Sequence, residues 1–106
     1  MLDRFEENPY NPPSVKEAVA VSGEEIYAAL LDLDLLVQVS QEVVFRSEIL
    51  RVMKDAVVEM ILASGTVSVA GFRDRFNTSR KYALAFLEHL DSIGLTVREG
   101  EGRRLK

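Results

Sequence analysis

The chain has 106 residues, with 13 Lys and Arg against 17 Asp and Glu and a formal net charge of −4. This length allows one ordinary domain or two very small ones, and a hydrophobic fraction of 47% excludes a disordered chain. The lack of cysteine excludes disulfides, thiolate nucleophiles and zinc ribbons, and the single histidine, His89, is too few for a histidine-clustered metal site.

The N-terminal stretch carries the acids Asp3, Glu6 and Glu7, where a targeting peptide would be basic and apolar. No apolar run reaches the length of a membrane-spanning helix. We therefore expect a cytoplasmic, α-rich module that is not an enzyme.

The first half of the chain predicts two helices followed by a hairpin. Ser14, with a glutamate three residues later, is the predicted N-cap of a helix over residues 15–21. A second helix over residues 24–34 has apolar side chains at helical spacing, predicted to be buried: Ile26, Tyr27, Leu30, Leu31 and Leu33. Two short strands, over residues 35–39 and 43–45, complete an order of elements that is typical of a winged-helix module.

The second half predicts a complete module of the same plan. A long helix over residues 47–63 has one buried face, formed by Ile49, Met53, Ala56, Val57, Met60 and Ile61. A brief strand, a helix over residues 69–76 and a helix ending at Ile93 follow, and the last of these buries Ala83, Phe86, Leu87, Leu90 and Ile93. Strands over residues 95–98 and 103–105 form the final hairpin. The predicted fold is mainly α with small β-wings: tandem winged-helix modules over residues 1–45 and 46–106, the first of them truncated.

The net charge hides a division between the two ends of the chain. Residues 1–65 hold 5 Lys and Arg against 12 Asp and Glu, whereas residues 66–106 hold 8 against 5. Such asymmetry is typical of a polyanion-binding end carried on an acidic one.

The basic residues of the second half are predicted to gather at one end of the helix that precedes Ile93 and on the adjoining hairpin. A helix N-terminus presents free backbone N–H groups that suit phosphate. Arg98 and Arg104 are expected to project from neighbouring strands into the same positive concavity. Tyr82 either stacks on a base or packs against the hairpin, and both remain open. The predicted binding residues are Arg73, Ser79, Arg80, Lys81, Tyr82, Arg98, Arg103 and Arg104.

The sequence contains no motif that predicts a catalytic or cofactor-binding site. No histidine–carboxylate pair lies near Ser79, so a nucleophilic serine is not expected. The glycines at positions 100 and 102 precede no helix and so do not form a phosphate loop. We expect no cofactor and no metal.

Residues 71–83 (GFRDRFNTSRKYA), followed by 87–91 (LEHLD), 94–96 (GLT), 98–100 (REG) and Arg103, resemble one family as a set. They are similar to the C-terminal end of the bacterial selenocysteine-specific elongation factor. The resemblance covers residues 66–104, and the preceding acidic module is similar to that family's penultimate winged helix in its order of elements.

This resemblance implies four tandem winged helices, of which the chain would hold most of the third and all of the fourth. The last one would bind the selenocysteine insertion (SECIS) hairpin of the messenger RNA, so that selenocysteinyl-tRNA is delivered at UGA. GTP, the tRNA and the ribosome would be bound through absent domains, since no GxxxxGK[ST] motif exists here, and a monomer is expected. By position, Arg73, Ser79, Arg80, Lys81 and Arg98 match the family's RNA-facing elements. Val97 and Glu99 depart from its pattern.

Two other functions remain open at this point. A winged-helix DNA-binding transcription regulator would need base-reading residues along the middle of the last helix, where Ala85 and Glu88 stand instead. A protein-interaction winged helix would fit the acidic first module and would bind no nucleic acid.

Overall fold

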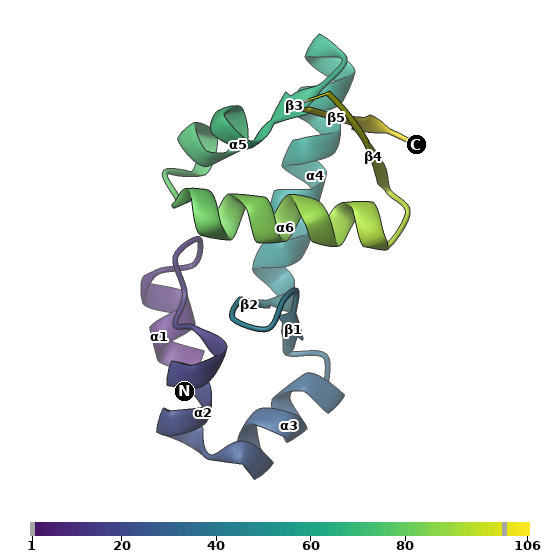
Figure 1. The fold of residues 1–106 in the computed structure, drawn as a ribbon. Helices are drawn as coiled ribbons and strands as arrows, with labels where there is room; N and C mark the ends of the chain where they lie inside the picture. Colours follow the sequence, from purple (N-terminus) through teal and green to yellow (C-terminus); the bar gives the residue numbers. More distant parts are fainter. Residues whose placement is uncertain (1, 101) are drawn as a thin grey trace. The chain divides into compact units, whose positions relative to one another are not determined.

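The computed structural model describes residues 2–100 and 102–106, and Figure 1 shows their fold. The mainly α fold with small antiparallel wings is confirmed. In chain order the elements are α1 (Leu2–Glu7), α2 (Val15–Ser22), α3 (Glu24–Asp32), β1 (Leu36–Gln38), β2 (Val44–Arg46), α4 (Ser47–Ser64), β3 (Val67–Ser68), α5 (Val69–Phe76), α6 (Arg80–Ser92), β4 (Thr96–Glu99) and β5 (Gly102–Leu105).

The chain divides into two compact units, residues 1–51 (unit 1) and 52–106 (unit 2). The division lies inside α4, a short way after the module boundary predicted between residues 45 and 46. Each unit ends in a small antiparallel hairpin, β1–β2 in unit 1 and β4–β5 in unit 2. The module bounds themselves stay a prediction.

Unit 1 packs its three short helices and its hairpin around one small core. The Ser14 hydroxyl accepts a hydrogen bond from the backbone N–H of Glu17 at 3.1 Å, which caps α2 as its sequence predicts. The Tyr27 hydroxyl donates to Oε1 of Gln38 at 2.9 Å, and burial raises the pKa of this tyrosine. The buried residues of this core are Phe5, Ala18, Tyr27, Leu36 and Val44.

The predicted buried stripe of α3 is wrong in two places. Ile26 is 54% exposed and Leu33 is 68% exposed, whereas Tyr27 is buried. The buried side is set by Tyr27 together with the partly buried Leu30 and Leu31, and Ile26 lies one residue, or about 100° of rotation, away from it. Leu33 follows the last helical residue as the C-cap, so it leaves the helical face altogether.

Unit 2 is built around the aromatic side chains of α5 and α6. The rings of Phe72 and Phe86 stack with centroids 5.1 Å apart, and Phe76 lies 4.8 Å from Phe72. Ile93, predicted to be buried, is instead 50% exposed because α6 ends at Ser92 and Ile93 is its C-cap. The other four predicted core positions of α6 are fully buried: Ala83, Phe86, Leu87 and Leu90.

The long helix α4 supplies apolar side chains at the spacing that its sequence predicts. Met53, Ala56, Val57 and Ile61 are buried within unit 2, and Met60 is partly buried. The three-stranded sheet of unit 2 has the order β3-β5-β4, so the last strand of the chain lies in the middle. Strand β5 therefore pairs with both β3, the short strand just before α5, and β4, the outer strand of the wing.

Candidate nucleic-acid interface

The start of α6 is sharply defined by residues on both sides of the turn that precedes it. Asn77 adopts the left-handed conformation, with φ 51°, and closes α5 as its C-cap. Ser79 is extended, and its hydroxyl accepts the backbone N–H of Tyr82 at 3.3 Å. Arg80 is consequently the first residue of α6, with its position set by the cap rather than by a flexible loop.

A cavity of about 310 Å³ lies in unit 2 where the elements of the wing and the two short helices meet. Three arginines from separate elements line it: Arg80 from α6, Arg98 from β4 and Arg103 from β5. The remaining lining residues are small or apolar: Ser68, Val69, Ala70 and Leu84. Three arginines around one small cavity form a positively charged site suited to phosphate oxygens, which guanidinium groups bind in bidentate fashion.

Arg103 is the most buried of the three, at 2% exposure, and the end of α6 supplies its counter-charge. Its Nε donates to Oδ2 of Asp91 at 3.2 Å. The other carboxylate oxygen, Oδ1, accepts the hydroxyl of the buried Thr96 at 2.6 Å. One carboxylate in the last turn of α6 thus holds both strands of the wing.

The other two arginines of the cavity differ from Arg103 in exposure and in pairing. Arg80 and Arg98 are both exposed. Within residues 2–100 and 102–106, the ion pairs of unit 2 that the structure describes involve Arg73, Arg103 and Arg104, and neither Arg80 nor Arg98. Their charge is therefore available to an anion from solvent.

The expectation that Arg98 and Arg104 share one concavity is wrong. In the ladder between β4 and β5, Arg98 pairs with Arg103 and Val97 pairs with Arg104, so Arg98 and Arg104 project from opposite faces of the wing. Nε of Arg104 lies 2.9 Å from Oε2 of Glu99, the acid whose place in the wing departs from the family pattern. The cavity lies on the Arg98 face.

The structure thus separates the eight predicted residues into those at the cavity and those outside it. Arg80, Arg98 and Arg103 line the cavity. Ser79 is the N-cap of α6 and immediately precedes Arg80. Arg73 lies outside and is paired with its neighbour Asp74 at 3.3 Å. Lys81, Tyr82 and Arg104 also do not line it; Lys81 is exposed and Tyr82 half-buried.

Sequence reasoning missed the two residues that support the cavity, Asp91 and Thr96. In the sequence, Asp91 stands only as the last residue of the segment 87–91 and is given no role of its own. Its partnership with Arg103 depends on the closeness of the helix end and the central strand, which no local motif encodes. Thr96 carried a usable signal, because a polar residue between apolar positions at the start of a predicted strand needs a partner.

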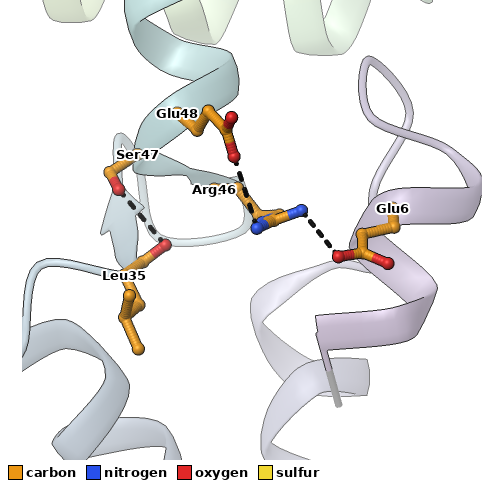
Figure 2. A network of polar contacts seen from close by, with 5 residues as sticks. All are labelled: Glu6, Leu35, Arg46, Ser47 and Glu48. Carbon is orange, nitrogen blue, oxygen red and sulfur yellow. Dashed lines mark hydrogen bonds and ion pairs between the residues drawn. The ribbon is translucent and has the colours of Figure 1, made fainter.

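Unit 1 has a second cavity, of about 300 Å³, in which one arginine is paired with two carboxylates. It is lined by Leu35, Arg46, Ser47, Glu48 and Arg51. Figure 2 shows that Arg46 is held between Glu6, at 3.2 Å, and Glu48, at 3.4 Å. The Ser47 hydroxyl donates to the carbonyl oxygen of Leu35 at 3.5 Å. With its central arginine bound by two carboxylates, this cavity is less suited to a phosphate than the one in unit 2.

The described residues form neither a cluster of metal ligands nor a helix able to cross a membrane. Across residues 2–100 and 102–106, no group of three His, Cys, Asp or Glu side chains is placed to hold a metal ion. None of the helices described is both long and apolar enough to cross a membrane.

Comparisons with known proteins find a family model that matches one segment of the chain and solved structures with a similar fold. Residues 59–105 match the family model of the winged helix of elongation factor SelB. The solved mRNA-binding domain of elongation factor SelB from E. coli, in complex with SECIS RNA, is similar with a TM-score of 0.80 and 19% identity over 98% of this chain and 94% of that one. A bacterial selenocysteine-specific elongation factor is similar with a TM-score of 0.75 and 26% identity over 88% of this chain and 16% of that one. Among curated proteins none matches.

Proposed function

Because residues 59–105 match the family model of the winged helix of elongation factor SelB, we propose that this chain binds a hairpin of messenger RNA. The hairpin is the selenocysteine insertion element, and its capture brings selenocysteinyl-tRNA to a UGA codon in the cytoplasm. The chain spans only 16% of the bacterial elongation factor that it resembles. GTP hydrolysis, tRNA binding and ribosome contact therefore belong to other parts of such a factor, and this chain acts as a monomeric binding module without catalysis.

The observation that carries the proposal is the cavity of unit 2. Two exposed arginines from different elements, Arg80 and Arg98, line it together with Arg103, which is paired with Asp91. Their concentration in one small cavity suits the sharply turned phosphates of a hairpin loop better than the evenly spaced phosphates of a long duplex. The solved E. coli domain with the same fold is in complex with SECIS RNA, which supports RNA as the ligand.

The remaining predicted residues complete the proposed surface. Ser79 and Lys81 flank Arg80 at the start of α6, where backbone N–H groups add to the positive potential. Tyr82 and Arg73 extend the surface away from the cavity. Arg104 contributes less to it, because its charge is paired with Glu99 on the opposite face of the wing.

Unit 1 has the opposite charge character. Residues 1–51 hold 4 Lys and Arg against 10 Asp and Glu. Phosphates are repelled by such a surface, so we assign unit 1 the role of an acidic spacer that keeps RNA on unit 2.

The proposal is tested by titrating a fluorescently labelled SECIS-type hairpin with the whole chain at moderate salt. Arg80→Ala should weaken binding by about 1 kcal/mol or more, since it removes a charge-assisted phosphate contact. Arg75→Ala is the matched control, because Arg75 is an exposed arginine of the neighbouring helix α5 that does not line the cavity. Equal affinity of the wild type for the hairpin and for random duplex DNA would favour a DNA regulator. Absence of binding to either would favour a protein-interaction module.

A further inference from the structure

A carboxylate lies beneath the proposed phosphate site, where its charge alone would weaken binding. Asp91 contacts Arg103, a residue that lines the cavity. The Asp91 side chain itself is only half-buried. A negative charge at this place repels the phosphates that Arg80 and Arg98 attract. Its presence therefore calls for a role that outweighs this repulsion.

Resting on the proposed function, we propose that Asp91 is a positioning residue for RNA binding: it holds Arg103 and the wing in the one arrangement that aims the arginines into the cavity. Its Oδ2 accepts a hydrogen bond from Nε of Arg103 at 3.2 Å. Its Oδ1 accepts one from the Thr96 hydroxyl at 2.6 Å. The two bonds use separate oxygens, so this one side chain holds both strands of the wing at once.

The placement of these bonds explains how Asp91 also acts on Arg98. Thr96 lies two residues before Arg98 on the same face of β4, and Arg103 is the cross-strand partner of Arg98 in β5. Asp91 thus fixes the strand positions next to Arg98 on both sides. Because Asp91 belongs to α6, the helix that begins with Arg80, the same bonds set the distance between the two exposed arginines.

The direction in which one substitution changes the affinity for the hairpin distinguishes a positioning role of Asp91 from the effect of its charge. Asp91→Ala removes a negative charge next to the cavity, so electrostatics alone predicts tighter binding of the hairpin. Alanine can accept a hydrogen bond from neither Arg103 nor Thr96, so the positioning role predicts weaker binding. Glu99→Ala is the matched control: it removes the same charge from the same wing, at a carboxylate that holds Arg104 on the face away from the cavity.

The experiment measures the dissociation constant of a labelled SECIS-type hairpin for the whole chain, at a temperature where circular dichroism shows each variant folded. We expect Asp91→Ala to bind about tenfold or more weakly, because both bonds that position Arg103 and the wing are lost, and Glu99→Ala to bind as tightly as the wild type or more tightly. An Asp91→Ala variant that binds as tightly as the wild type, while Arg80→Ala is weakened, overturns the positioning role alone. A wild type that binds no hairpin overturns the proposed function and this inference with it.

A second variant, Thr96→Val, tests the inference if Asp91→Ala does not fold. Thr96→Val replaces a buried hydroxyl by a methyl group of similar size and leaves every charge in place. We expect hairpin binding about three- to tenfold weaker, because the Oδ1 anchor of the wing is lost while the Arg103 pair remains. Unchanged affinity in the folded Thr96→Val variant contradicts the inference.

Discussion

Arg98 and Arg103 lie directly opposite each other in the ladder between β4 and β5. Like charges in this relation are about 5 Å apart at Cβ and destabilise a hairpin. The structure relieves the repulsion on one side only, because Arg103 is buried and paired with Asp91 while Arg98 is exposed. A bound phosphate would relieve it on the other side, so the pair favours an occupied cavity.

The first prediction concerns the salt dependence of hairpin binding. Arg98→Ala should reduce the slope of log K against log salt concentration by about 1, because one phosphate contact and its released counterion are lost. Arg104→Ala should change the slope less, since Arg104 is paired with Glu99 on the opposite face of the wing. Titrations at several salt concentrations measure both slopes. Equal reductions in the two variants would show that the RNA contacts both faces.

Local signals in the sequence account for most of the helices and their starts. Ser14, Ser68 and Ser79 each accept the backbone N–H three residues later, as an N-cap does. One helix, α1, lies where none is predicted from the sequence, and the other errors fall where a helix ends or rotates. Ile26, Leu33 and Ile93 continue an apolar spacing that the folded chain does not continue, because two of them are C-caps and the third faces away from the core.

The candidate site was predictable as a set of cations but not as a geometry. That Arg80 begins a helix follows from the Ser79 cap, which is a local pattern. That Arg98 faces Arg103, and Arg104 the other side, depends on the strand register, and a shift of one residue would exchange the two faces. The pairing of Asp91 with Arg103 is a tertiary contact between a helix end and the central strand, so it has no local signature.

The second prediction concerns the cap that positions Arg80. Ser79→Ala should lower the free energy of unfolding by about 1 kcal/mol, because the backbone N–H of Tyr82 loses its acceptor. Ser79→Gly should cost only a few tenths of that, since glycine is tolerated at an N-cap. Urea unfolding of the whole chain measures both. A midpoint unchanged by Ser79→Ala would mean that the cap contributes nothing to stability.

The third prediction concerns the aromatic core of unit 2. Phe86→Ala should cost about 3–5 kcal/mol, because it opens a cavity beside Phe72 and loses the stacked pair. Ile93→Ala should cost under about 1 kcal/mol, since that side chain is half exposed and lies past the end of α6. Chemical denaturation compares the two. A large loss of unfolding free energy in Ile93→Ala would show that Ile93 packs in the core, and would contradict its half-exposed position as the C-cap of α6.

The fourth prediction concerns the pH dependence of stability through His89. Burial, and then the nearby charge of Lys54, lower the pKa of His89 below its ordinary value of 6.5. The unfolded chain therefore takes up a proton more readily than the folded one. The stabilisation is complete above the unfolded pKa and is lost as the pH falls through the lower, folded pKa.

His89→Gln, which does not titrate, should flatten this dependence between about pH 5.5 and 7.5, where His89 is the side chain whose unperturbed pKa falls in the range. Urea midpoints of wild type and variant across that range measure it. Hairpin affinity at pH 7.5 should be the same in both, because His89 does not line the cavity and is neutral there. Parallel curves for the two proteins would show that protonation of His89 does not oppose folding.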